Sequence, residues 1–133
     1  MLAKYKKMKQ QLEYQLQKQI CQYLELQYPE VLFLSDTIAS VRLTIPQQLR
    51  NKAIQKKNFA CPDLLILEPR KAFNGLFIEL KTKTPFKKNG ELLKSDHLKR
   101  QAKTIEELNK KGYLSQFSWG FEMTKELIDN YLK

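Results

Sequence analysis

Apolar residues recur at helical intervals along the first part of the chain. Between Lys4 and Gln27 neither proline nor glycine occurs. The apolar and aromatic residues on one helical face are Leu12, Leu16, Ile20, Tyr23 and Leu24. Tyr28-Pro29 follows, and proline disfavours a helical conformation of the residue before it. The pattern predicts one long amphipathic helix over residues 4–27.

Shorter runs of strand-forming residues come next. Residues 31–34 predict a short strand, and the apolar residues Val41, Leu43 and Ile45 alternate like a second strand. Pro46 stands where it could open a short surface helix as far as Lys56. The polar and basic composition of this segment places it at the surface.

Residues 63–67 and 76–81 have the clearest strand patterns of the chain. The connection between them contains Pro69 and an Asn74-Gly75 pair, which favours a reversing turn. We therefore expect an antiparallel hairpin that closes near Asn74-Gly75. Its register does not follow from the sequence, because the connection is longer than a two-residue turn.

The last third of the chain alternates helix and strand patterns. A basic, turn-rich loop at 83–90 precedes Ser95 and Asp96, either of which could cap a helix that runs to Lys111. The expected inner face of this helix carries Leu98, Ala102, Ile105 and Leu108. Gly112 can end it in a left-handed conformation, residues 116–119 predict a strand, and 122–132 a final helix. The whole order predicts a single α/β domain over residues 1–133, with a mixed central β-sheet flanked by helices.

Charge narrows the range of partners. The chain has 133 residues, 24 Lys and Arg against 14 Asp and Glu, and a net charge of +10. Such a surplus attracts polyanions, with nucleic acid as the first candidate and an acidic membrane surface as the rival. The basic segment at about 1–10 lacks the apolar stretch of a secretory signal, and no apolar run reaches the ~20 residues that span a bilayer. We expect a soluble, cytoplasmic protein whose Cys21 and Cys61 are reduced and packed.

Basic clusters indicate where nucleic acid would bind. The expected phosphate contacts are Lys56, Lys57, Lys87, Lys88, Lys99, Arg100 and Lys103. Each cluster taken singly is more often a solvated face, but their sum supports a salt-sensitive contact with DNA. Tyr5 could stack on a base, whereas Tyr14 is expected in the core. His97, the only histidine, is expected at the surface, because one histidine without a second ligand makes no transition-metal site.

The hairpin carries residues suited to metal-assisted hydrolysis. Side chains alternate along a strand, so Glu79 and Lys81 share one face, about 6.6 Å apart along the strand. Asp63 begins the partner strand and can converge with Glu79. Two carboxylates commonly hold Mg²⁺, which activates water for attack on a phosphodiester, and an ammonium offsets the developing charge. The alternative is that Asp63 caps a turn and that Glu79 pairs with Lys81 on a solvated face.

Two polar residues lie on apolar helix faces. Glu13 lies within about 20° of Ile20 and Leu24, and Gln101 lies about 20° from Leu108. A polar group on such a face is costly unless it meets a cation, a metal or a hydrogen-bond partner. The alternative interpretation of each residue is that its side chain lies at the rim of the core and takes part in no site. Together with the hairpin residues, they indicate one polar site.

The order of these residues resembles the PD-(D/E)XK nuclease superfamily, and especially its VRR-NUC branch of small stand-alone proteins from phages and bacteria. The matching residues are Glu13, Pro62-Asp63, then after fifteen residues Glu79-Leu80-Lys81, and Gln101. The resemblance covers most of the chain between residues 13 and 132.

The resemblance implies a restriction-endonuclease-like core that needs Mg²⁺ or Mn²⁺ and cleaves structured DNA. The small members resemble Holliday-junction resolvases that act as homodimers. The implied metal ligands are Asp63, Glu79, Glu13 and, through its backbone carbonyl, Leu80. Lys81 would serve the attacking water and Gln101 would steady the site, so that both join Asp63 and Glu79 as catalytic residues. No small-molecule cofactor and no membrane partner are expected.

Three alternatives stay open at this point. The first is a nucleic-acid-binding module of the same fold without catalysis. The second is a restriction-type endonuclease that reads a short duplex sequence. The third is a protein that binds a membrane surface.

Overall fold

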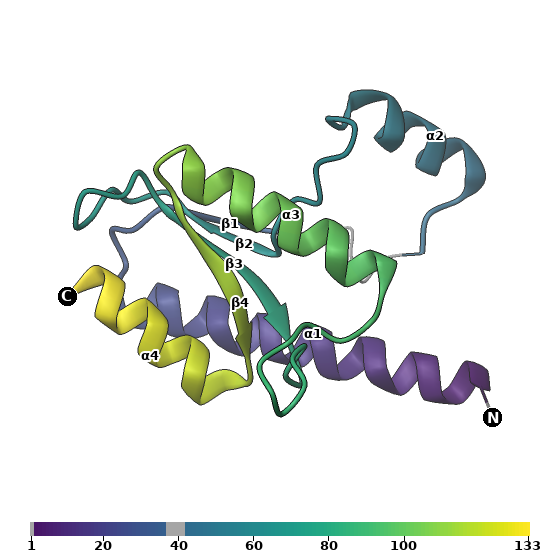
Figure 1. The fold of residues 1–133 in the computed structure, drawn as a ribbon, viewed down its shortest axis with the longest axis horizontal. Coiled ribbons are helices and arrows are strands. Elements are labelled where there is room, and N and C mark those ends of the chain that lie inside the picture. Colours follow the sequence, from purple (N-terminus) through teal and green to yellow (C-terminus); the bar gives the residue numbers. More distant parts are fainter. Residues whose placement is uncertain (1, 37–41) are drawn as a thin grey trace.

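The computed structural model describes residues 2–36 and 42–133, and within them one four-stranded sheet is surrounded by helices. The elements in chain order are α1 (Leu2–Gln27), β1 (Phe33–Ser35), α2 (Ile45–Ile54), β2 (Leu64–Ile66), β3 (Leu76–Lys81), α3 (Asp96–Lys110), β4 (Leu114–Trp119) and α4 (Phe121–Leu132). Figure 1 shows α3 on one face of the sheet, α1 and α4 on the other, and α2 standing apart from these layers. The predicted α/β fold is confirmed.

The sheet is mixed, with strand order β1-β2-β3-β4. The first two pairings are antiparallel, whereas β3 and β4 are parallel and are joined by the crossover through α3. The core on the α1 and α4 side consists of Leu16, Ile20, Leu24, Leu64, Ile66, Leu76, Ile78, Ile128, Tyr131 and Leu132. Because β3 is a central strand with both faces covered, its side chains from Leu76 to Glu79 are all buried.

The hairpin of β2 and β3 closes at a different turn from the expected one. Arg70 and Phe73 form a bridge, and Lys71 and Ala72 between them have φ values of 52° and 70°. Two successive left-handed residues match the twist of a tight hairpin. Asn74 instead uses its backbone N–H to bond the carbonyl of Gly112, beyond the end of α3, at 2.8 Å.

The segment before α2 also differs from the expectation. No strand forms over the described residues 42–45, and Val41 lies outside the described residues. Thr44 caps α2 instead, since its side chain accepts from the Gln47 backbone while the Gln47 side chain accepts from the Thr44 N–H. The predicted short surface helix is confirmed, and no residue of α2 is buried.

The inner face of α3 is shifted relative to the predicted face, whereas in α1 the predicted residues Leu16, Ile20 and Leu24 are buried. In α3 the buried residues are Gln101, Thr104 and Leu108, while Leu98, Ala102 and Ile105 are only half-buried. In α1 the residues Leu12 and Tyr14 are exposed, because the N-terminal half of the helix extends beyond the sheet (Figure 1).

None of the helices in the described part of the chain is long and apolar enough to cross a membrane.

A buried carboxylate joins α1 to α4. Asp129 accepts hydrogen bonds from the hydroxyls of Tyr23 at 2.5 Å and Tyr28 at 2.6 Å, and the Lys125 ammonium lies 3.1 Å away. Burial alone would raise the pKa of Asp129, but these three partners outweigh it and lower the pKa to about 2.

Candidate active site

Asp63 and Glu79 meet at the open end of the hairpin. The register pairs Leu64 with Ile78, so the next residues outward, Asp63 and Glu79, lie opposite each other. A hydrogen bond joins the two carboxyl groups. Asp63 Oδ2 also accepts the backbone N–H of Leu80 at 2.9 Å. Glu79 is only 4% exposed, so its carboxyl group is held in the protein interior.

Ionising both carboxyl groups at the same time costs free energy. Burial and the charge of Asp63 raise the pKa of Glu79 to about 9. Burial also raises the pKa of Asp63, although its bonds to Glu79 and Leu80 and the nearby Lys81 oppose the shift. The pair therefore retains one proton more strongly than two separate carboxyl groups would.

Gln101 and His97 extend the pair towards α3. The Gln101 amide, 6% exposed, donates to Glu79 Oε1 at 2.7 Å, and its Nε2 lies 3.1 Å from His97 Nε2. Partial desolvation of the ring by the neighbouring side chains, followed by the charges of Lys81 and Arg100, lowers the pKa of His97. His97 is exposed as predicted, but it also lines the cleft, which the sequence prediction missed. The sequence did offer a signal for this position, because His97 lies one helical turn before Gln101 and therefore on the same helix face.

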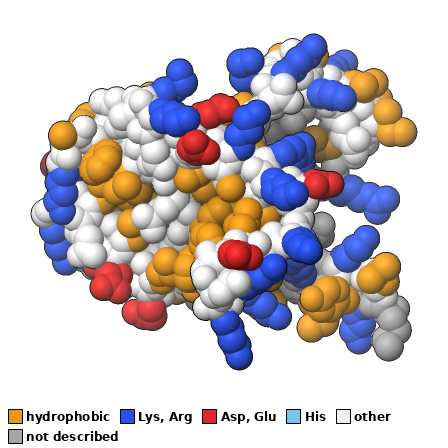
Figure 2. Space-filling view, viewed as in Figure 1, with side chains coloured by type: hydrophobic (Ala, Val, Ile, Leu, Met, Phe, Trp, Pro, Cys, Tyr) orange, Lys and Arg blue, Asp and Glu red, His pale blue; other side chains and the backbone are white. Residues whose placement is uncertain are grey.

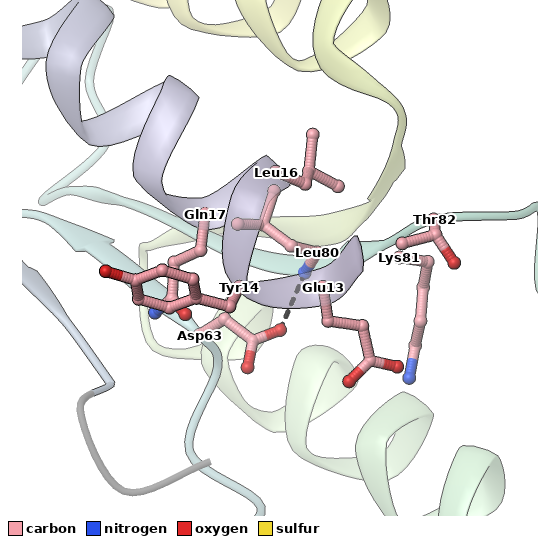
Figure 3. A pocket seen from close by; sticks show the side chains of 8 residues that line it. All are labelled: Glu13, Tyr14, Leu16, Gln17, Asp63, Leu80, Lys81 and Thr82. Atoms are coloured by element: carbon pink, nitrogen blue, oxygen red, sulfur yellow. Dashed lines mark hydrogen bonds between the residues drawn. The ribbon is translucent and has the colours of Figure 1, made fainter. Parts of the chain in front are cut away.

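Glu13 and Lys81 line the same cleft as Asp63. Figure 3 shows the Glu13 side chain on α1 and the Lys81 side chain on β3 extending in the same direction, with Asp63 turned towards the Leu80 N–H. The Lys81 ammonium lies 6.0 Å from the centre of the Phe117 ring. Glu13 is exposed rather than buried against Ile20 and Leu24, but it lines the same cleft as the carboxyl pair.

The cleft has a volume of about 520 Å³ and contains residues that the sequence did not assign to the site. These additional residues are Asp36, Asn58, Phe59, Ala60 and Cys61. Asp36 reaches the site because its backbone N–H bonds the Asp63 carbonyl at 2.9 Å, just beyond the end of β1. Cys61 is free, as expected, but exposed rather than packed. No local sequence pattern marked these positions, because strand pairing and the return from α2 bring them together.

Of the predicted basic residues, one lines this cleft and three line the groove next to it. Arg100 lines it, whereas Lys56, Lys57 and Lys103 line a neighbouring groove. Lys87, Lys88 and Lys99 are in neither lining, and Lys87 lies 3.8 Å from Glu91. Figure 2 shows that lysine and arginine side chains gather around a hollow on the side of the molecule that carries α2, the start of α3 and the N-terminal half of α1.

The side chains alone provide an incomplete metal shell. Among residues 2–36 and 42–133, no three His, Cys, Asp or Glu side chains gather closely enough to form a metal-ligand cluster. Asp63 and Glu79 are two oxygen donors in contact, and a backbone carbonyl is needed for a third. The Lys81 carbonyl accepts the Gly120 N–H on the β4 side. Backbone alternation therefore directs the Leu80 carbonyl to the other side, where Asp63 lies.

Comparison with known proteins supports the fold assignment. No protein-family model matches the chain, and no curated protein matches it. Among solved structures it is similar to a VRR_NUC domain protein, with a TM-score of 0.55 over 90% of this chain and 87% of that chain, at 21% identity. The chain therefore shares the α/β fold of that protein. The resemblance to VRR-NUC proteins that the motif predicted is confirmed at the level of the fold.

Proposed function

We propose that this chain is a divalent-metal-dependent endonuclease that hydrolyses phosphodiester bonds in structured DNA. The observation that carries the proposal is the contact between the buried carboxyl group of Glu79 and the half-buried carboxyl group of Asp63, with Lys81 on the same strand face as Glu79. The fold similarity to a VRR_NUC domain protein supports the same class of reaction.

The carboxyl pair suits Mg²⁺ or Mn²⁺, since both ions prefer oxygen ligands. A buried carboxyl group in contact with a second one is stabilised by a proton or a cation, and the raised pKa of Glu79 reflects this. Asp63, Glu79 and the Leu80 carbonyl would hold the ion, and Glu13 would add to its shell from the wall of the cleft. When bound, the ion would polarise the phosphodiester and acidify a water molecule.

The surrounding residues would have separate tasks. The Lys81 ammonium would orient the attacking water and offset negative charge on the phosphate oxygens. Gln101 would hold the Glu79 carboxyl group in one orientation through its amide. The lysine and arginine side chains around the cleft would hold the DNA backbone, so binding would weaken steeply with salt.

Cleavage of a DNA panel tests this proposal. Four-way junctions, flaps, nicked duplexes and linear duplexes are incubated with Mn²⁺, Mg²⁺ or EDTA. Cutting of branched DNA is expected only with a metal, and Asp63→Ala or Glu79→Ala should abolish it while binding persists. Glu122→Ala removes an exposed carboxylate on α4 and serves as the control.

The other outcomes separate the alternatives. Binding without cutting under any condition would overturn the enzymatic proposal in favour of a binding module. Preferential cutting of one linear duplex sequence would favour a restriction-type enzyme. Full activity of both carboxylate variants would mean that the site is assigned wrongly.

A homodimer and a cytoplasmic location also stay predictions. Symmetric cutting of a junction requires two active sites, so we propose that two copies act together. Light scattering of the purified chain, with and without a four-way junction, tests the dimer directly.

A further inference from the structure

A second hollow, lined by several lysines, adjoins the cleft. It lies between residues 56–59 and α3, has a volume of about 430 Å³, and is called here the Phe59 groove. The lysines in its walls are Lys56, Lys57, Lys103 and Lys111. Only Glu107 carries a negative charge among the residues that line it. The groove therefore favours an anionic ligand.

Phe59 gives this basic groove an aromatic surface. Its side chain is 39% exposed, although a phenylalanine usually packs inside a protein. Lysines beside an accessible aromatic ring are the combination that binds single-stranded nucleic acid, since the ring stacks on a base while the ammonium groups contact phosphates. A base inside a duplex hides both of its faces in the stack, so Phe59 would discriminate in favour of an unpaired base.

The Phe59 groove is continuous with the carboxyl pair. Asn58 and Phe59 line both the groove and the cleft that contains Asp63 and Glu79. A strand lying along α3 in the groove would therefore enter the cleft at Phe59.

The shared wall has a defined structure. The Ala60 N–H donates to Thr104 Oγ1 at 3.0 Å, and Thr104 is only 2% exposed, so this bond ties the segment to α3. Asn58 turns the chain just before it with a φ of 60°, in the left-handed region that asparagine tolerates better than most residues. Phe59 is thus held in place rather than carried on a free loop.

We propose that the Phe59 groove binds an unpaired nucleic-acid strand and leads it to the carboxyl pair. The binding step stands on the groove alone, whereas the delivery to a scissile bond rests on the proposed nuclease function. The favoured substrate would then be a nucleic acid with a single-stranded segment next to the cleaved bond.

Binding of short labelled oligonucleotides to the full chain in EDTA tests the proposal by fluorescence anisotropy. Phe59→Ala is expected to weaken binding of oligo(dT) about 5- to 100-fold, while Phe59→Tyr keeps near wild-type affinity. Oligo(U) of the same length shows whether DNA or RNA is preferred, and Phe59-dependent binding of either supports the groove. Lys103→Ala should weaken binding and lower its salt dependence. Lys110→Ala, on the same helix but paired with Glu106, is the charge-matched control.

Two results would overturn the inference. One is unchanged oligonucleotide binding in Phe59→Ala, with thermal unfolding confirming that the variant is folded. The other is an equal loss of affinity in Phe59→Ala for a blunt duplex and for an unpaired strand. Because no metal is present, these results do not depend on catalysis. A protein that binds in this way but never cuts would refute the nuclease proposal and leave the groove intact. A protein whose cutting does not depend on Phe59 would leave the nuclease proposal standing and refute the delivery of the strand through the groove.

Discussion

The side-chain amide of Gln101 donates a hydrogen bond to Glu79 Oε1 over 2.7 Å, and this contact joins α3 to the centre of the sheet. Both side chains are buried, so water cannot readily replace either partner. Gln101 therefore sets the orientation of the carboxyl group that also contacts Asp63.

Removing this amide should impair the site more than the fold. Gln101→Leu is expected to lower metal-dependent cleavage about 10- to 100-fold, because outer partners of metal ligands typically contribute that much. Single-turnover cleavage with a titration of Mn²⁺ measures the change. Gln116→Leu replaces an amide on β4 and provides the matched control. Full activity of Gln101→Leu would show that the contact has no part in the reaction.

His97 should be neutral at physiological pH. Partial desolvation of the ring first, and then the charges of Lys81 and Arg100, lower its pKa from the ordinary value of 6.5. An NMR titration of the single imidazole should therefore give a midpoint below 6.5. Arg100→Ala removes one of the repelling cations and should move the midpoint upwards. A midpoint above 6.5 in the wild-type protein would contradict the described environment.

The raised pKa of Glu79 should appear in the stability of the metal-free protein. In the folded state its pKa is about 9, against 4.5 for an unperturbed glutamate. The folded protein thus keeps a proton that the unfolded chain loses, so the contribution of Glu79 to stability is fully present below about pH 4.5 and is lost as the pH rises to about 9. Glu79→Gln lacks this loss.

Urea unfolding in EDTA measures this effect. Relative to wild type, Glu79→Gln should gain at least about 1 kcal/mol between pH 5 and pH 9, since one pKa unit corresponds to roughly that energy. Mn²⁺ should recover stability in the wild type at high pH and do so less in the variant. If the unfolding free energies of the two proteins changed in parallel with pH, Glu79 would ionise without loss of stability, and the prediction would be wrong.

Asp129 should stabilise the junction of α1 and α4 in a pH-dependent way. Its pKa is lowered to about 2 in the folded protein, so its contribution is present above the unfolded value near 4 and lost as the pH falls towards 2. Asp129→Asn is expected to cost roughly 1.5–3 kcal/mol at neutral pH, the usual range for hydrogen bonds to a charged group.

Urea unfolding of both proteins at several pH values gives the measurement. The difference between wild type and Asp129→Asn should shrink between about pH 4 and pH 2. Tyr28→Phe removes one donor and should give a smaller loss at neutral pH. A constant difference over the whole pH range would mean that the charge of Asp129 does not contribute.

Short-range patterns were sufficient for most helices and strands. Ser95 was recognised as a candidate cap, and its hydroxyl does accept the Leu98 N–H before α3. Gly112 was expected to end that helix, and its φ is 93°. Alternation along β3 likewise placed Glu79 and Lys81 on one face. These features depend on residues within a few positions of one another, so the amino-acid order specifies them directly.

The site itself required contacts between distant parts of the chain. The tight turn at Lys71 and Ala72 sets the register that brings Asp63 opposite Glu79, and a shift of one residue would have turned Glu79 to the other face. The return from α2 brings Phe59 to the same cleft, and nothing in its local sequence indicated that position. Residue types and their alternation are properties of the chain order. Register, burial and the neighbours of a charge arise only when separate segments pack, because each depends on where the rest of the chain lies.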